Sequence, residues 1–297
     1  MSGDVGWEDQ RAFLAVVEAG SLSGAARRLG IAQPTVRARI ETLERALGTS
    51  LFTRSVNGLV PTEQALALTG PARTMARASD AFIRAASAPA GEIAGTVRLS
   101  VSEFVGIEVL PAMLAGLRLA YPRIVPEISL SNASADVLDQ EADIAIRMHA
   151  PLQGALLVKK VGAIPLGFFA HVDYLARRGT PMAVADLAGH DIIGPDKNRS
   201  DLRIAAAIDA GMTRERLAVR TDSHPAQLAL VRAGLGIGVV QRPAGSRDPS
   251  LRAVLPDLEI GALETWIVTH EDLGEIPRVR VVFDHLIEGF TAYVRSR

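Results

Sequence analysis

The most constraining feature of this sequence lies within residues 7–61. Three short helical patterns there are each ended by a glycine and are followed at once by an Asn-Gly turn. Apolar residues recur at helical spacing in the first and third patterns, and alanine dominates the second. Glycine readily takes the left-handed conformation that ends a helix. The pattern therefore predicts helices over residues 7–19, 24–29 and 33–47.

The third helical pattern has the signs of a helix with one buried face. Gln33-Pro34 opens it, and a proline in the first helical turn loses no hydrogen bond. Its apolar residues recur at i, i+4, i+7 and i+11, which predicts an inward-facing stripe made of Val36, Ile40, Leu43 and Leu47. Ahead of it, Ser23 offers a hydroxyl that would cap the second helix. Two helices joined by a short glycine turn form a helix-turn-helix, whose second helix can enter the major groove of DNA.

A β-hairpin is predicted directly after the third helix. The residues on either side of Asn57-Gly58 have strand character, and this dipeptide is the strongest short hairpin signal. A hairpin that follows a reading helix is called a wing. Arg54 and Asn57 would then lie where a wing can touch the DNA backbone or the minor groove.

Charge is distributed unevenly along the chain. The whole sequence has a net charge of -1, but residues 21–54 hold six arginines and two glutamates, a local charge of +4. A basic segment on a nearly neutral chain is typical of a DNA-binding head on a soluble body. The other interpretation, a plain three-helix core with solvated arginines, stays open on these patterns alone.

The candidate DNA contacts follow from this arrangement. Gln33 and Thr35 stand at the N-terminal end of the third helix, where base edges are usually read. Arg37 and Arg39 flank the apolar stripe, so their long side chains can reach phosphates. The complete set of predicted DNA-binding residues is Ser23, Arg27, Gln33, Pro34, Thr35, Arg37, Arg39, Arg54 and Asn57.

The run GSLSGAARRLGIAQPTVRARIETLERALGTSLFTRSVNGLVPTEQA resembles the winged helix-turn-helix of LysR-type transcriptional regulators. The shared pattern is Gly-Ser, an Ala-Ala-x-x-Leu helix, Gln-Pro, Leu-Glu, Leu-Gly and Leu-Phe-x-Arg. The resemblance implies a DNA-binding domain at residues 1–61. It places Gln33, Pro34, Thr35 and Arg39 at the start of the reading helix and Arg54 on the wing.

A long helix is predicted over residues 62–88, capped by Thr62 and kinked or interrupted early by Pro71. Two series of residues spaced by seven give this helix a 3.5-residue seam, as in helix–helix dimers. The resemblance favours a linker helix that dimerises, whereas the alternative is a helix packed on its own domain. The predicted dimerisation residues are Leu68, Ala72, Met75, Ser79, Phe82 and Ala86.

Beyond a hinge at Pro89-Ala90-Gly91, predicted strands and helices alternate, which implies an α/β fold with a largely parallel sheet. The predicted strands are 97–101, 126–130, 143–147, 166–170, 217–220, 237–240 and 265–269. The predicted helices are 107–121, 135–140, 172–178, 225–233 and 278–293.

This part, residues 92–297, resembles the effector domain of LysR-type regulators, most clearly in EADIAIR (141–147) and AGLGIG (233–238). The resemblance implies a two-lobed fold similar to periplasmic binding proteins, with the ligand in the cleft. Its two lobes would be joined by two crossover strands. Lobe one would comprise residues 92–161 and 267–297, and lobe two would comprise residues 162–266.

Candidate effector-binding residues follow the carboxyl ends of the predicted strands, where ligands of such sheets bind. Hydroxyls, an amide and an arginine would suit a small carboxylate, whereas Glu103 argues for a cationic group, so no ligand is named. The alternatives are that Ser102 and Ser223 only cap helices, that Arg147 pairs with an acid, and that His224 is structural. The candidates are Ser102, Glu103, Phe104, Ser131, Asn132, Arg147, Ser223 and His224.

Enzyme and cofactor signals are weak. The chain has no cysteine, which excludes thiolate metal sites and a cysteine nucleophile. Gly234–Gly238 resembles a nucleotide loop, but it follows a helix and leads into a strand, which is the wrong order for one. The six histidines are scattered, so neither a catalytic residue, a metal nor a cofactor is expected. The N-terminus lacks an export signal and the apolar runs are too short to span a bilayer, so we expect a cytoplasmic protein.

The sequence thus predicts a transcriptional regulator that binds specific DNA and senses a small-molecule effector. Its expected partners are double-stranded promoter DNA, an unknown effector, further copies of itself in a homodimer or homotetramer, and RNA polymerase; no membrane partner is expected. The alternative is an α/β ligand-binding or enzymatic body whose N-terminal helices serve only for assembly. Effector, operator, direction of control and oligomer size are not predicted.

Overall fold

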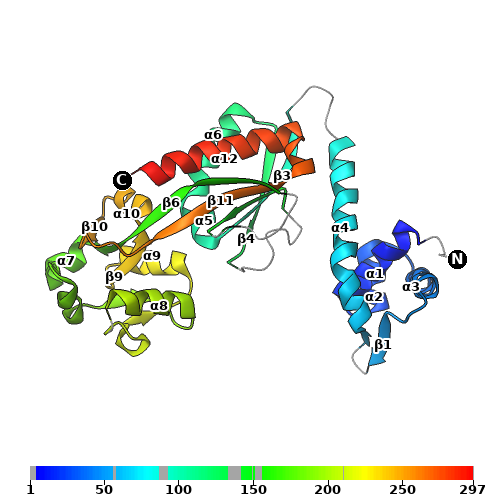
Figure 1. Cartoon of the computed structure of the whole chain (residues 1–297), viewed down its shortest axis with the longest axis horizontal. Helices are drawn as coiled ribbons and strands as arrows, with labels where there is room; N and C mark the ends of the chain where they lie inside the picture. Colours follow the sequence, from blue (N-terminus) through cyan, green and yellow to red (C-terminus); the bar gives the residue numbers. More distant parts are fainter. Residues whose placement is uncertain are drawn as a thin grey trace. The chain divides into compact units, whose positions relative to one another are not determined.

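The computed structural model describes residues 5–55, 58–86, 93–132, 142–148, 150, 156–209 and 211–296. The chain divides into two compact units, residues 1–87 and 88–297. The first is a small helical domain with a two-stranded sheet, and the second is an α/β domain built on a nine-stranded sheet (Figure 1).

The N-terminal unit contains the predicted three helices, hairpin and long helix, namely α1 Trp7–Ala19, α2 Leu22–Leu29, α3 Gln33–Leu47, β1 Phe52–Ser55, β2 Gly58–Pro61 and α4 Glu63–Ala86. Gly20, Gly30 and Gly48 end the first three helices with φ of 64°, 67° and 68°, as the sequence predicts. Its core is formed by apolar residues from all four helices and by Leu51 ahead of the hairpin.

Two details of these helices differ from the prediction. The cap of α2 is Ser21, whose hydroxyl accepts a hydrogen bond from the Gly24 amide at 3.1 Å. Ser23 instead lies exposed in the first helical turn, because the helix starts two residues earlier than predicted. Val36, Ile40 and Leu43 are buried as predicted, but Leu47 is exposed because it belongs to the last turn of α3.

The hairpin is attached to the residue that ends α1 by a backbone hydrogen bond next to Gly58. The Leu59 amide donates a hydrogen bond to the Gly20 carbonyl at 3.0 Å. Gly58 has a φ of +128°, and a Cβ there would lie 2.6 Å from the same carbonyl oxygen. Glycine at this position therefore allows both the turn and the close approach.

Helix α4 runs unbroken past Pro71, and the Thr62 hydroxyl caps it by accepting a hydrogen bond from the Ala65 amide at 3.2 Å. The residues of the predicted dimerisation seam differ in burial between the first and the second half of the helix. Ala72 is buried in the core of its own unit and Leu68 packs against that core, so these two residues follow the alternative interpretation. Met75 and Phe82 are exposed, and the side chain of Ala86 lies outside the described residues.

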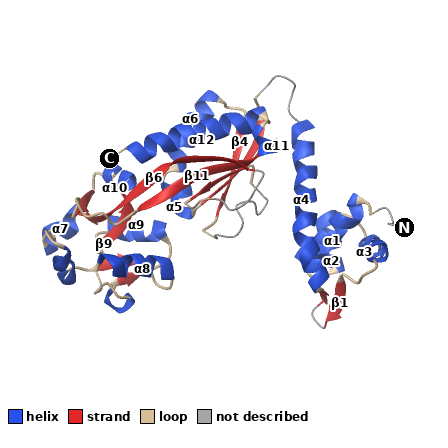
Figure 2. Cartoon of the chain, viewed as in Figure 1, coloured by secondary structure: helices blue, strands red, loops and turns tan. Residues whose placement is uncertain are grey.

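The C-terminal unit is a mixed sheet covered by helices (Figure 2). Its strand order is β4-β3-β5-β11-β6-β9-β7-β8, with β10 paired to β6. The strands are β3 Gly95–Val101, β4 Ile124–Leu130, β5 Ile144–Arg147, β6 Leu156–His171, β7 Ile192–Gly194, β8 Val219–Arg220, β9 Ile237–Gln241, β10 Leu251–Val254 and β11 Ala262–His270. The helices are α5 Glu103–Glu108, α6 Leu110–Ala120, α7 Val172–Arg178, η1 Val184–Gly189, α8 Arg199–Ile208, η2 Arg214–Arg216, α9 His224–Arg232, α10 Arg242–Arg247, α11 Glu271–Gly274 and α12 Pro277–Arg295.

Two long strands connect the two ends of this sheet. β6 pairs with β11 through residues 156–165 and with β9 and β10 through residues 166–171. The β6–β11 ladder has a register shift between Thr265 and Trp266. The predicted lobe boundaries, at 161/162 and 266/267, fall inside these two strands at or next to the irregularity, and they stay predictions.

Several elements differ from the predicted ones. The helix predicted over 107–121 is two helices, α5 and α6, because Pro111 lacks the amide that a continuous helix needs. The strand predicted over 166–170 is the second part of the longer β6. Strands β7 and β10 and helix α8 were not predicted, and the helix expected over 135–140 lies outside the described residues.

Candidate functional site

The first turns of α3 present a polar surface to solvent. Gln33, Pro34, Thr35 and Arg37 are exposed, whereas Val36 and Ile40 on the opposite face are buried in the core. Gly30 ends α2 in the left-handed conformation just ahead of this helix. The α2–α3 pair therefore has the form of a helix-turn-helix whose second helix is free along one face.

The arginines near this surface differ in their contacts. Arg27 and Arg37 are exposed, and neither forms an ion pair with any residue that the structure describes. Arg39 is held by α1, since its guanidinium Nη1 lies 2.7 Å from the Glu8 carboxylate. This ion pair partly neutralises a side chain that the sequence assigns to phosphate contact.

The hairpin supplies the predicted wing. Arg54 lies on β1 opposite Leu59 of β2, in an antiparallel ladder of four residue pairs. The side chain of Arg54 and the whole of Asn57 lie outside the described residues, so their predicted contacts stay predictions.

The C-terminal unit holds a cavity of about 320 Å³. Four of its polar lining residues lie at the carboxyl ends of parallel strands: Ser102 follows β3, Ser131 follows β4, Arg147 ends β5 and Asp222 lies just after β8. Most of the remaining wall is apolar, with Ile146, Phe168, Ile192, Ile193, Ile204, Met212, Leu217 and Val239 among its residues. Such a mostly apolar cavity with a few polar groups is typical of small-molecule sites.

Arg147 lies at one wall of this cavity. Its Nη1 donates to the carbonyls of Ser100 and Ile146 at 3.0 and 3.1 Å, and its Nη2 donates to the Ser100 hydroxyl at 2.8 Å. All three acceptors are neutral, and burial lowers the pKa of the guanidinium. Within the described part of the chain, Arg147 has no acidic partner, contrary to the alternative interpretation of this residue.

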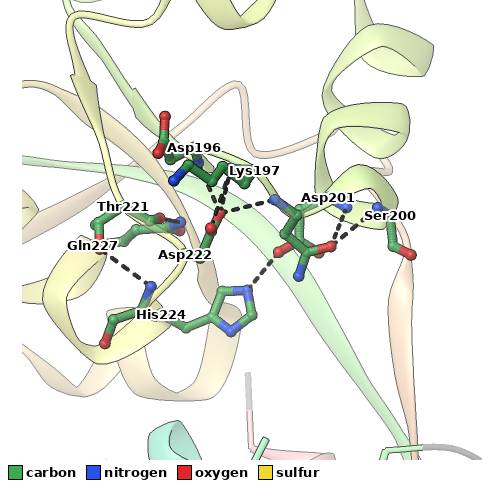
Figure 3. Close-up of polar contacts among 10 residues, drawn as sticks. Asp196, Lys197, Ser200, Asp201, Thr221, Asp222, His224 and Gln227 are labelled. Carbon is green, nitrogen blue, oxygen red and sulfur yellow. Dashed lines mark hydrogen bonds and ion pairs between the residues drawn. The ribbon is translucent and has the colours of Figure 1, made fainter. Parts of the chain in front are cut away.

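A second part of the cavity wall carries Asp201, Asp222 and His224 (Figure 3). The His224 Nε2 lies 3.0 Å from the Asp201 carboxylate, and this hydrogen bond raises the pKa of His224. The Asp222 carboxylate accepts hydrogen bonds from the amides of residues 196, 197 and 198 at 2.8 to 3.1 Å. Those amide donors, the Asn198 amide foremost, lower the pKa of Asp222.

Two glutamines fix neighbouring elements at this cavity. The Gln227 amide group donates to the Thr221 carbonyl at 2.7 Å, which holds the start of α9 against the end of β8. The Gln241 oxygen accepts a hydrogen bond from the buried Tyr293 hydroxyl at 2.9 Å, which joins β9 to α12. Both glutamines line the cavity and are buried.

Each of the two units matches a known protein family. The family described as "Bacterial regulatory helix-turn-helix protein, lysR family" matches residues 7–66, and the "LysR substrate binding domain" matches residues 90–291. The chain belongs to the LysR family of bacterial transcriptional regulators. The family consists of DNA-binding regulators with an effector-binding domain rather than of enzymes.

Individual LysR relatives agree with this assignment. A regulator from Xanthomonas campestris is 29% identical over 192 residues, which are 65% of this chain and 56% of that protein. CrgA from Neisseria meningitidis serogroup C is 25% identical over 296 residues, which are 95% of this chain and 96% of CrgA. Full-length CbnR, solved with its target DNA, has the same fold with a TM-score of 0.61 at 19% identity, over 98% of this chain and 99% of that one.

In this LysR effector domain, six of the eight predicted effector residues line the cavity: Ser102, Phe104, Ser131, Asn132, Arg147 and His224. Glu103 and Ser223 are not part of its wall. Ser102 and Ser223 stand at the N-cap positions of α5 and α9, but neither side chain makes a capping hydrogen bond. The two serines therefore occupy cap positions, but they do not cap the helices through their side chains.

Most of the second wall was not predicted from the sequence. Asn198 and Asp201 belong to the unpredicted α8 and its cap, and Asp222 precedes the predicted Ser223 by one residue. The same strand-end rule that selected Ser223 could have selected Asp222. Asn198 and Asp201 carried no comparable signal, because the strand ahead of them, β7, is only three residues long.

Metal sites and membrane spans are both missing from the described residues. These residues contain no group of three or more histidines, aspartates and glutamates that could hold a metal ion. No helix among them is both long and apolar enough to cross a membrane.

Proposed function

We propose that this LysR-family protein binds double-stranded promoter DNA through α3 and the hairpin and that a small molecule in the cavity controls this binding. The exposed face of α3 carries the proposal: Gln33 and Thr35 offer hydrogen-bonding groups for base edges, and Arg37 offers an uncommitted charge for a phosphate. Arg27 and Arg54 would add backbone contacts on either side.

The protein acts as a homodimer or homotetramer in this proposal. The second half of α4 supports it, because Met75, Phe82 and Ile83 are 42%, 76% and 62% exposed. Apolar side chains on one stretch of a helix are usually covered by a partner. Two copies would place two reading helices in successive major grooves.

Effector control would act through the domain that contains the cavity. A ligand can shift a conformational equilibrium only by binding one state more tightly than the other. The cavity lies between elements from both ends of the sheet, so a ligand there contacts the start of α5 as well as the start of α9. The paired DNA-binding units would respond to this change, with RNA polymerase at the promoter as the final partner and the cytoplasm as the place of action.

A gel-shift assay tests this proposal. The full chain, at low salt, is mixed with the DNA upstream of its own gene and with a scrambled duplex of equal length. We expect tight binding to the first and weaker binding to the second. The double variant Gln33→Ala/Thr35→Ala should lose this preference, because removal of base contacts relaxes specificity at about 1–3 kcal/mol per contacted base pair.

Equal binding of the wild-type chain to both duplexes would contradict sequence-specific recognition. Arg45→Ala is the matched control, since Arg45 is exposed on the same helix but lies in its last turn. It should leave the preference for the upstream DNA unchanged.

A further inference from the structure

The charged groups that line the effector cavity differ in how well they are compensated. On the wall formed by α8 and α9, each acidic side chain already has its donors. Asp222 accepts from three backbone amides and also lies within reach of the positive charge of Lys197, and Asp201 is bound to His224. The hydrogen bond to Asp201 favours protonated His224 and so places a positive charge against that carboxylate. This wall therefore has little unsatisfied negative charge.

Arg147, on the wall formed by β3 and β5, is in the opposite situation. A guanidinium has five N–H donors, and the described contacts of Arg147 use three of them on neutral oxygens. No carboxylate of the described residues neutralises its charge. A partly buried cation without a counter-charge favours an anion that can reach its remaining donors.

The neighbourhood of Arg147 adds a second donor. Ser102 follows β3, which pairs with β5 in parallel register, so both residues lie at the ends of adjacent strands and line the same cavity. The Ser102 side chain makes no capping hydrogen bond. Its hydroxyl is therefore available to an oxygen atom of a ligand beside Arg147.

The rest of the cavity limits what else the ligand can be. Ile146, Phe168, Ile193, Ile204 and Val239 supply apolar wall. A volume of about 320 Å³ is at the lower end of the roughly 300–1,000 Å³ of small-molecule sites. A nucleotide or a sugar phosphate would leave many polar groups without partners against such walls.

We infer that the effector is a small organic carboxylate with a compact apolar body. Its carboxylate binds Arg147 and the Ser102 hydroxyl, and its body fills the space between Phe168, Ile193 and Val239. The inference deepens the proposed function and rests on it only in taking the cavity as the effector site.

The test compares isosteric probes that differ in charge. Cyclohexanecarboxylate, cyclohexanecarboxamide and cyclohexylmethylamine are titrated into the full chain by calorimetry, and hexanoate, hexanamide and hexylamine form a second, linear series. We expect the carboxylate of at least one series to bind about tenfold to a hundredfold more tightly than its amide, as hydrogen bonds to a charged group imply. The amine should bind most weakly.

Variants locate the site. Arg147→Gln should abolish the advantage of the carboxylate over the amide, whereas Arg147→Lys should keep part of it. Lys159→Gln is the matched control, because it removes one positive charge from an exposed position on β6 and should change nothing. Ser100→Ala removes a hydrogen-bond partner of Arg147 but leaves its guanidinium in place. It therefore distinguishes a loss of carboxylate preference caused by disturbed folding from one caused by loss of the positive charge.

Equal affinity for carboxylate and amide, preference for the amine, or no binding of either series at millimolar concentration would each overturn the inference. The preference of the wild-type chain for the carboxylate over the amide tests the inference even where Arg147→Gln fails to fold. A gel shift on the same preparation separates this failure from that of the proposed function. A chain that binds its upstream DNA but shows no preference for carboxylates retains the function and loses only the effector class.

Discussion

Arg27 and Arg37 of the N-terminal unit differ from Arg232 of the C-terminal unit in whether their charge already has an acidic partner. Arg27 and Arg37 are exposed and have no acidic partner among the described residues. Arg232, in contrast, is bound to Glu108 through two hydrogen bonds of 2.8 Å and to Asp248 through a third of 2.8 Å. Arg27 and Arg37 are therefore available to a ligand, whereas Arg232 connects α9 to α5 and to the turn before β10.

This difference shows why a count of charges is a poor measure of DNA binding. Residues 21–54 carry a net charge of +4, but Arg28 and Arg39 are paired with Glu18 and Glu8, which lie outside that segment. The arginines without such a partner are the ones that can release counterions from DNA. The presence or absence of an acidic partner, and not the number of arginines, therefore distinguishes a DNA-binding surface from a network of structural ion pairs.

The largest expected effect concerns Arg232. Arg232→Met leaves the Glu108 and Asp248 carboxylates, 16% and 18% exposed, without their cation. We expect the free energy of unfolding of the C-terminal unit to fall by about 1–3 kcal/mol, measured by denaturant titration. Arg220→Met, an exposed position in the same unit, is the control, and an equal loss in both variants would remove the distinction between bound and free arginines.

Arg37→Ala tests the exposed arginines that have no acidic partner among the described residues. The variant should fold as stably as the wild type, because Arg37 is exposed and has no partner in the described structure. We expect its affinity for the upstream DNA to fall about threefold to tenfold, because one charged donor to a phosphate is removed; fluorescence anisotropy measures this affinity. Unchanged affinity would show that Arg37 does not face DNA.

Glu8→Gln sharpens the comparison by freeing Arg39, together with Arg11, whose guanidinium lies 3.7 Å from the same carboxylate. The Glu8–Arg39 pair is partly exposed and contributes about 0–1 kcal/mol to stability. Its removal should leave the melting temperature almost unchanged and strengthen DNA binding a few-fold, since Arg39 would gain a free charge and one acid would be lost. Weaker binding in this variant would instead mean that Glu8 holds Arg39 in the orientation that DNA requires.

The smallest expected effect is the pH dependence of the His224–Asp201 pair. The hydrogen bond to Asp201 raises the pKa of His224 above its ordinary value, and the charges of Asp201, Asp222 and Glu103 act in the same direction. The pair therefore stabilises the fold fully below about pH 6.5, and this stabilisation is lost as the pH rises through the raised pKa. Thermal melts between pH 6 and 8 should show a decline that Asp201→Asn flattens; an unchanged decline in that variant would assign it to other groups.

The N-terminal unit could be predicted almost completely from the sequence because its signals are local. Left-handed glycines end three helices, and the two strands of the hairpin, which the Asn-Gly dipeptide predicts, are adjacent in the chain. The two errors there are the position of the α2 cap, predicted at Ser23, and the burial predicted for Leu47, which lies in the last turn of α3 and is exposed.

The cavity was only half predictable because its walls are assembled from distant segments. The strand-end rule selected Ser102, Ser131 and Arg147, which line the cavity, since those strands were recognised. Strand β7 is a three-residue buried strand without periodicity, and α8 has no buried residue to reveal its face. The residues that these two elements contribute, Asn198 and Asp201, could not be selected by that rule.

The salt dependence of binding to the upstream DNA tests the central claim most directly. The logarithm of the association constant is measured against the logarithm of salt concentration for the wild type, Arg37→Ala and Arg232→Met. We predict a steep slope for the wild type and the same slope for Arg232→Met. The slope for Arg37→Ala should be shallower by about 0.9, because this variant neutralises one phosphate fewer. An unchanged slope for Arg37→Ala together with a reduced slope for Arg232→Met would contradict the account.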